Sequence, residues 1–140
     1  MRNPTATQVH GTMASILVID DEKALRRALA LMLERAGHTT AQAATGHEAI
    51  QMIRRNPPDI VLTDIFMPEQ DGFEVIMVVR EELPALKIIA MSGAYPEAPL
   101  YLAVARKLGA AATLQKPFRP EQLKATLTSV LERKSEPAQE

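Results

Sequence analysis

Three aspartates stand directly after two apolar, β-branched runs of the sequence. Asp20 and Asp21 follow Ser15–Ile19 (SILVI), and Asp64 follows Ile60–Thr63 (IVLT). Carboxylates that pack together repel, and each raises the pKa of its neighbours, so a bound divalent cation would stabilise them. Oxygen ligands without His or thiolate are typical of a site for Mg²⁺, or for Mn²⁺. If the two runs are neighbouring strands, these aspartates are candidate metal ligands.

A hydroxyl group and an ammonium group follow two further apolar runs. Ser92 and Gly93 come after Leu86–Met91 (LKIIAM), and Lys116 comes shortly after Ala111–Leu114 (AATL). A lysine supplies a point positive charge, while a serine hydroxyl or the backbone N–H of Gly93 donates a hydrogen bond. A cation, an ammonium and a hydroxyl aimed at one point suit a phosphoryl group. A carboxylate in the same place is a nucleophile that would form an aspartyl phosphate.

Alternating strands and helices would bring these residues together. Five runs predict strands, the second less apolar and so typical of a sheet edge, over Ser15–Ile19, His38–Ala43, Ile60–Thr63, Leu86–Met91 and Ala111–Leu114. Five segments with helical spacing predict helices, over Glu22–Ala36, Gly46–Arg55, Phe73–Glu82, a segment from Tyr95-Pro96-Glu97 to Leu108, and Glu121–Arg133. This order predicts an α/β fold, a doubly wound parallel sheet with helices on both faces. Such sheets bind ligands at the carboxyl ends of their strands.

Length and composition exclude several classes of protein. The 140 residues suit one domain, and we predict a flexible leader over 1–13, a domain over 14–134 and a flexible tail over 135–140. The net charge of −1 gives no electrostatic footprint for nucleic acid or an anionic membrane. The absence of Cys excludes a disulfide scaffold and thiolate chemistry. No apolar run is long enough to span a membrane, and the N-terminus lacks a secretory signal, so we expect a cytoplasmic protein.

Four stretches of the sequence resemble the receiver domain of two-component response regulators. They are LVIDDE (17–22), DIVLTDIFMPEQDGFE (59–74), IIAMSGA (88–94) and LQKPF (114–118). The match is specific because the four motifs follow the appropriate predicted strands in the family's order. The resemblance covers nearly the whole chain, and it implies a flavodoxin-like (βα)5 fold of five parallel strands in the order 2-1-3-4-5.

The resemblance also implies a role for each polar residue at the ends of the strands. Asp64 matches the phosphorylated aspartate of the family. Ser92, the backbone N–H of Gly93 and Lys116 match the groups that contact the phosphoryl group, and the Lys116-Pro117 bond is normally cis. The implied metal shell has four oxygen donors, from Asp20, Asp21, Asp64 and the backbone carbonyl of Phe66.

One position departs from the family's pattern. Receivers usually carry Tyr or Phe three residues before the lysine, and that ring turns inward on activation, but this chain has Thr113. Ser92 can still move toward a phosphoryl group, because a hydroxyl donor stabilises its negative charge. We therefore predict a switch that depends on Ser92 and the loop to Tyr95, in which Thr113 adds only a short hydroxyl contact. Tyr95 or Tyr101 is the candidate substitute ring.

The resemblance implies a signalling phosphoacceptor, which catalyses only its own phosphorylation and slow autodephosphorylation, and not a conventional enzyme. We expect the phosphoryl group to come from a sensor histidine kinase or a histidine phosphotransfer protein. We expect no output domain in the chain and no direct contact with nucleic acid or membrane. An unknown downstream protein would read the face formed by the last two predicted helices and the last strand.

Other interpretations remain for parts of the pattern. A phosphorylation-independent adaptor on the same fold is the main alternative, although such proteins usually lose the acceptor or the acidic pair. A phosphohydrolase of the haloacid-dehalogenase type needs a second Asp two residues after the nucleophile, where this chain has Phe66. A flavin-binding protein needs a phosphate loop rich in Ser, Thr or Gly after the first strand, where this chain has DDEKAL. Taken alone, Asp20 is also typical of a helix N-cap, a role compatible with metal binding.

Overall fold

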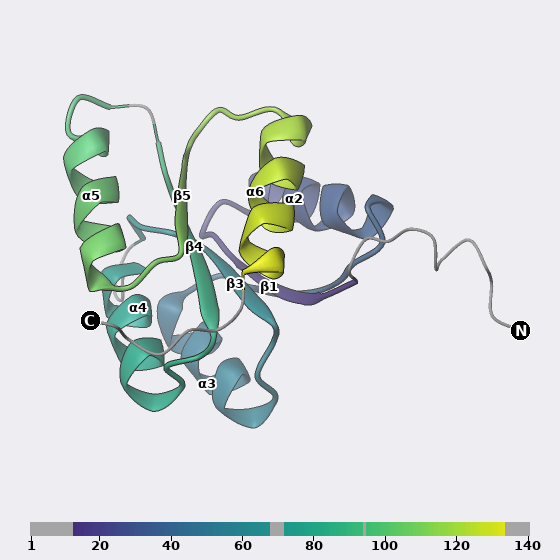
Figure 1. Cartoon of the computed structure of the whole chain (residues 1–140), viewed down its shortest axis with the longest axis horizontal. Coiled ribbons are helices and arrows are strands. Elements are labelled where there is room, and N and C mark those ends of the chain that lie inside the picture. Colours follow the sequence, from purple (N-terminus) through teal and green to yellow (C-terminus); the bar gives the residue numbers. More distant parts are fainter. Residues whose placement is uncertain (1–12, 68–71, 94, 134–140) are drawn as a thin grey trace, which may run out of the picture.

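The structure, a computed structural model, describes residues 13–67, 72–93 and 95–133. Within these residues, strands and helices alternate along the chain as predicted (Figure 1). The elements are β1 (Ser15–Ile19), α2 (Lys23–Arg35), β2 (Thr39–Ala43), α3 (Gly46–Arg55), β3 (Ile60–Asp64), α4 (Gly72–Glu82), β4 (Lys87–Ser92), α5 (Ala98–Leu108), β5 (Ala112–Gln115) and α6 (Pro120–Glu132). The predicted leader, apart from Met13, and the predicted tail lie outside the described residues. None of the described helices has the length and apolarity needed to cross a lipid bilayer.

The strands form one parallel sheet in the order β2-β1-β3-β4-β5, which confirms the predicted topology. β1 lies between β2 and β3, and its last residue, Ile19, pairs with Thr63 of β3. The residues that follow β1 therefore lie beside the end of β3. β2 is an edge strand with mostly exposed or half-buried residues, as its weaker apolar pattern predicted.

Helices cover both faces of this sheet. One face packs against α3, α4 and α5, through buried residues such as Val75, and the other packs against α2 and α6, through residues such as Leu29 and Leu127. Successive residues of β1, Leu17 and Val18, belong to these two opposite cores. Because both faces are buried, the central strands have continuous apolar sequences.

Three strands, β3, β4 and β5, continue one residue beyond their predicted ends. β3 includes Asp64, which pairs with Met91, and β4 includes Ser92, which pairs with Gln115. The backbone N–H of Lys116 donates to the Ser92 carbonyl at 2.7 Å, so the ladder between β4 and β5 persists to that point. Backbone pairing does not depend on side-chain polarity. Both polar side chains therefore stand at the last paired position of a buried strand.

α5 begins later than predicted. Tyr95–Glu97 lies outside the helix, which starts at Ala98 with Pro99 in its first turn. Proline fits the first turn because it has no N–H to donate there. Pro96 and Pro99 each predict the first turn of a helix, and in the structure it is Pro99 that lies in that turn. Tyr95 is thereby left in the connection between β4 and α5.

Arg80, near the end of α4, fastens three chain segments. Its guanidinium donates to the carbonyls of Pro84, Leu86 and Gly109, the last at 2.9 Å. Gly109 ends α5 with a φ of +122°, and a Cβ at that position would lie 2.5 Å from Nε of Arg80. Glycine suits this position because it adopts a positive φ without strain and has no Cβ to collide with Arg80.

Candidate functional site

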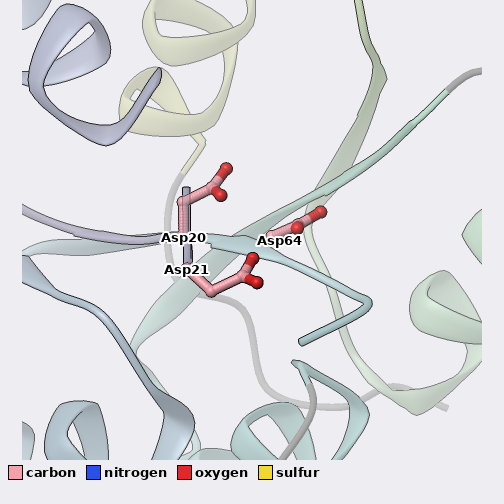
Figure 2. A group of neighbouring side chains, drawn as sticks. All are labelled: Asp20, Asp21 and Asp64. Atoms are coloured by element: carbon pink, nitrogen blue, oxygen red, sulfur yellow. The ribbon is translucent and has the colours of Figure 1, made fainter. Parts of the chain in front are cut away.

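The carboxyl ends of β1 and β3 bring three carboxylates together. One oxygen from each of Asp20, Asp21 and Asp64 lies within 4.8 Å of the other two. Figure 2 shows the three side chains gathered at this end of the sheet. Asp20 and Asp64 are buried, whereas Asp21 is exposed. Two of the carboxylates are therefore enclosed by the protein, and the third gives the cluster access to solvent.

Asp20 is held by both its backbone and its side chain. Its N–H donates to the carbonyl of Ala43 at 3.2 Å, and its own carbonyl accepts from Nη1 of Arg26 at 2.9 Å. The carboxylate accepts from the backbone N–H of Glu22 at 2.9 Å and from Nζ of Lys116 at 3.1 Å. Asp20 thus orders the turn before α2, but no side chain caps that helix. The two contacts of the carboxylate restrict its orientation.

The ammonium group of Lys116 contacts two of the carboxylates. Its Nζ lies 3.1 Å from Oδ2 of Asp20 and 3.4 Å from Oδ1 of Asp64. Burial alone would lower the pKa of Lys116, but the negative charges of Asp64 and Asp20 outweigh burial and raise it. The lysine therefore remains charged at neutral pH. Its bond to Pro117 is cis.

The carboxyl group of Asp64 is the most perturbed acid of the cluster. Burial, above all, raises its pKa from 3.8 to about 6; Lys116 opposes the rise, and Asp20 and Asp21 add to it. At neutral pH the group is still mostly ionised. The ionised form of Asp64 is energetically unfavourable in the folded state, and an added positive charge nearby would stabilise it.

Gly72, the first residue of α4, packs against the end of β3. Its N–H donates to the Ile65 carbonyl at 2.8 Å. A Cβ at this position would lie 2.8 Å from the Cα of Ile65 and would overlap the carbonyl oxygen of Asp64. Only glycine lets the helix approach the backbone that carries Asp64 so closely.

Ser92 is fully buried at the end of β4, and its hydroxyl already has a partner. Oγ donates to the hydroxyl oxygen of Tyr95 at 3.2 Å. Gly93 makes this contact possible, because a Cβ there would lie 3.0 Å from the Tyr95 ring. The backbone between β4 and α5 is thus folded closely around one tyrosine.

The side chains of two other residues predicted for the site contact α5 or the segment before it. The Phe66 ring is 39% exposed and packs against the rings of Tyr95 and Tyr101. The Thr113 hydroxyl accepts a hydrogen bond from Nη2 of Arg106 at 2.7 Å, which ties β5 to α5.

Sequence reasoning missed Arg26 and Gly72 as residues that shape the site. Arg26 holds the Asp20 carbonyl and also donates to the side chain of Gln42 at 3.2 Å, which links the turn to β2. The available signals were a basic residue near the start of the helix that follows the acidic pair, and a glycine directly before the predicted helix that follows Asp64.

The carboxylate cluster fits a divalent cation. Its donors are hard oxygens, and three negative charges against the single positive charge of Lys116 leave a net charge of 1 − 3 = −2. The exposure of Asp21 gives solvent access, which suits a cation that keeps part of its hydration shell. Residues from four strand ends therefore combine a cation site, an ammonium group and a hydroxyl group.

Comparison with known proteins identifies the family. The family model of the response regulator receiver domain matches residues 16–128. The chain belongs to this family. A curated relative of the receiver, the probable transcriptional regulator ycf27 of Porphyridium aerugineum, is 37% identical over 120 residues, which cover 84% of this chain and 48% of that protein. The transcriptional regulatory protein AfsQ1 of Streptomyces coelicolor is 34% identical over 123 residues, 86% of this chain and 52% of that protein.

Solved structures agree with this assignment. The receiver domain of NtrX from Brucella abortus superposes with a TM-score of 0.80 at 28% identity, covering 85% of this chain and 99% of that chain. The receiver spans about half the length of the two curated relatives. Receiver domains are signalling domains of two-component systems, not conventional enzymes; sensor histidine kinases phosphorylate them, and they bind Mg²⁺ at an acidic pocket.

Proposed function

We propose that this receiver accepts a phosphoryl group on Asp64 from a phosphohistidine of a sensor histidine kinase or a histidine phosphotransfer protein. The observation that carries the proposal is the placement of the Asp64 carboxylate, buried at the end of β3 beside the acidic pair and 3.4 Å from Nζ of Lys116. A pKa of about 6 leaves this carboxylate mostly ionised at neutral pH, which is its nucleophilic form.

The transfer uses groups that surround this carboxylate. An oxygen of Asp64 attacks phosphorus, the bond from phosphorus to the histidine nitrogen breaks, and the electron pair stays on the imidazole. Lys116 pairs with a phosphoryl oxygen, and the Ser92 hydroxyl and the Gly93 N–H donate to the others. Attack of water on the aspartyl phosphate later restores the carboxylate and releases inorganic phosphate, which is the slow autodephosphorylation.

The cofactor of this proposal is Mg²⁺, or Mn²⁺. The groups that would hold it are the carboxylates of Asp20, Asp21 and Asp64 and the backbone carbonyl of Phe66. When bound, it supplies positive charge to the phosphoryl oxygens. The hydrogen bond from the Glu22 N–H to the Asp20 carboxylate would hold this one ligand in place before the metal binds.

The remaining parts of the proposal concern partners and extent. The receiver unit comprises residues 14–134, and a downstream protein of unknown identity reads the face of α5, β5 and α6. Direct contact with nucleic acid or membrane is not part of this function, and a cytoplasmic location stays a prediction.

Intact mass spectrometry after incubation with Mg²⁺ and acetyl phosphate tests the proposal. The wild type should gain one phosphoryl group, and Asp64→Asn and Asp64→Ala should gain none. Asp59→Asn is the matched control, because Asp59 precedes β3 at its opposite end, is exposed, and accepts a hydrogen bond from Ser15 that an amide oxygen can also accept. A full-strength adduct in Asp64→Ala would contradict the assignment. No adduct on the wild type would favour a phosphorylation-independent adaptor.

Metal dependence is tested on the acidic pair. Asp20→Ala/Asp21→Ala should weaken Mg²⁺ binding in a calorimetric titration and slow the mass gain, because two of the oxygen donors are lost. Unchanged Mg²⁺ affinity in this double variant would show that the cation binds elsewhere.

A further inference from the structure

β2 forms one outer edge of the sheet. It pairs with β1 on its inner side, and the described part of the chain places no strand on its outer side. Its sequence, TTAQA, has no charged residue and no proline, and its register with β1 is continuous. Natural edge strands usually carry charges, prolines or bulges that prevent pairing with another chain. β2 has none of these, so its outer side is open to a further strand.

The backbone of β2 directs two residues outward. The N–H of Thr39 and the carbonyl of Ala43 make hydrogen bonds of 3.0 and 3.2 Å to the residues that flank β1. In a parallel ladder the residues of a strand bond alternately to one side and to the other, so Thr39, Ala41 and Ala43 face β1. The N–H and C=O groups of Thr40 and Gln42 therefore point away from the sheet.

An antiparallel copy of β2 would satisfy all four outward groups in a single register. With Ala41 opposite Ala41 of a second copy, Thr40 of each copy lies opposite Gln42 of the other. These two pairs exchange N–H and C=O bonds, and Ala41 occupies the pair between them, where antiparallel backbones come closest. Ala41 has a small, exposed side chain that lines a hollow of about 170 Å³ with Met52 and Pro58, so this position is open to a second strand.

The face of β2 that packs against α2 carries complementary charges. The hydroxyl of Thr40 donates to Oε2 of Glu34 at 2.6 Å. Nε of Arg26 donates to Oε1 of Gln42 at 3.2 Å. Because Thr40 lies opposite Gln42 in the register above, Glu34 of each copy faces Arg26 of the other. Opposite charges that face each other across paired strands stabilise the pairing.

The same side of α2 leaves room for a second helix. Arg26, Ala30 and Glu34 are four residues apart, so they lie along one side of α2 with the small Ala30 in the middle. A two-fold axis through the β2 pair makes the two α2 helices antiparallel. Their alanines then lie at the midpoint, and the acidic end of each row faces the basic end of the other.

We propose that the outer edge of β2 binds β2 of a second copy of this chain, antiparallel and centred on Ala41, and so joins two five-stranded sheets into one. The contact is isologous, because each copy contributes the same strand and the same charged residues. It uses the edge of the sheet opposite β5 and needs no phosphoryl group, so it goes beyond the proposed function and does not depend on it.

Cysteine cross-linking tests the register, because the chain has no Cys of its own. In the proposed pair the Cα atoms of the two copies of Ala41 lie about 4.5 Å apart, within the range of a disulfide. Copper phenanthroline should therefore convert native Ala41→Cys into a disulfide-linked dimer. Thr39→Cys is the matched control. Thr39 is exposed on the same strand but lies opposite Ala43, which separates its two copies by about 14 Å.

Sedimentation equilibrium over a concentration series, without Mg²⁺ or a phosphodonor, tests the association itself. The wild type should form a dimer as its concentration rises. Glu34→Lys should weaken the association at least about tenfold, because two attractive contacts with Arg26 become repulsive. Glu81→Lys is the matched control, because it makes the same charge change at an exposed residue of α4, and it should associate like the wild type. Far-ultraviolet circular dichroism checks that each variant is folded.

A wild type that stays monomeric at every concentration overturns the proposal. A dimer that Glu34→Lys does not weaken, or disulfide formation as fast in Thr39→Cys as in Ala41→Cys, also overturns it, because the contact then uses another surface or register. Neither result bears on the phosphorylation of Asp64, since the measurements contain no phosphodonor.

Discussion

Replacing Asp64 by Asn should stabilise the metal-free domain at neutral pH. The substitution keeps the shape of the side chain and removes its charge. The ionised carboxylate is unfavourable in the fold, first because it is buried and then because Asp20 and Asp21 are near, and Lys116 offsets only part of this. In the variant, Lys116 retains its 3.1 Å contact with Asp20, so the ammonium group keeps a partner.

The size of the effect follows from the pKa of Asp64. Folding raises this pKa from 3.8 to about 6, so the folded state binds the proton more tightly than the unfolded state does. The free energy of unfolding therefore falls as pH rises between these values, and the full cost remains above them. The difference, 6 − 3.8, is about 2.2 units, or about 3 kcal/mol at 1.36 kcal/mol per unit. Asn removes this cost, so the gain should be less than about 1 kcal/mol near pH 4 and about 3 kcal/mol at pH 7.

Urea denaturation in the presence of EDTA, at a series of pH values from about 4 to 7, measures this difference. Asp59→Asn is again the control, and its difference from the wild type should not grow with pH in the same way, because Asp59 lies outside the crowded cluster. If Asp64→Asn is no more stable than the wild type at pH 7, or if its gain is the same at pH 4, burial and crowding do not control the ionisation of Asp64.

Mg²⁺ binding and substitutions of three glycines provide further measurable outcomes. Mg²⁺ competes with the proton of Asp64, so its apparent affinity should fall about tenfold for each pH unit below about 6; a flat calorimetric profile would contradict the raised pKa. Gly72→Ala should lower the free energy of unfolding by about 1–3 kcal/mol, because α4 must retreat from β3, and a wild-type urea midpoint would exclude this. Gly109→Ala should also cost about 1–3 kcal/mol, since its positive φ and the Arg80 guanidinium both oppose a Cβ. Gly37→Ala, with a positive φ and no neighbour within 4 Å, should lose less.

The order of elements and the sheet topology could be predicted because their signals are local. Buried parallel strands such as β3 show as unbroken apolar runs, and the runs alternate with segments of helical spacing. The predicted ends of β3 and β4 were each one residue short, because the apolar pattern stops before Asp64 and Ser92 although the backbone pairing continues. The polarity of a side chain does not show whether the backbone of that residue is hydrogen-bonded to the next strand.

The contacts that adjust the site could not be predicted, because they join residues that meet only after packing. The Arg26 guanidinium reaches the Asp20 carbonyl across the turn before α2. Tyr95 contacts Ser92 because α5 begins only after Tyr95. The sequence did not show this start, because Pro96 and Pro99 are equally suited to the first turn of a helix. The predicted carboxylates and Lys116 do lie close together in the structure, and side-chain packing decides their partners.

The contact between Lys116 and Asp20 joins residues 96 positions apart, and this separation bears on how a new copy of the protein matures. Closing so long a loop is entropically unfavourable, so the contact forms with the last strand and not before. A chain emerging from the ribosome without β5 carries crowded carboxylates and no ammonium group to pair with them. Such a nascent chain lacks the lysine that the proposed transfer requires. Under the proposed function, a copy that ends before Lys116 cannot complete the transfer, so phosphorylation depends on synthesis through β5.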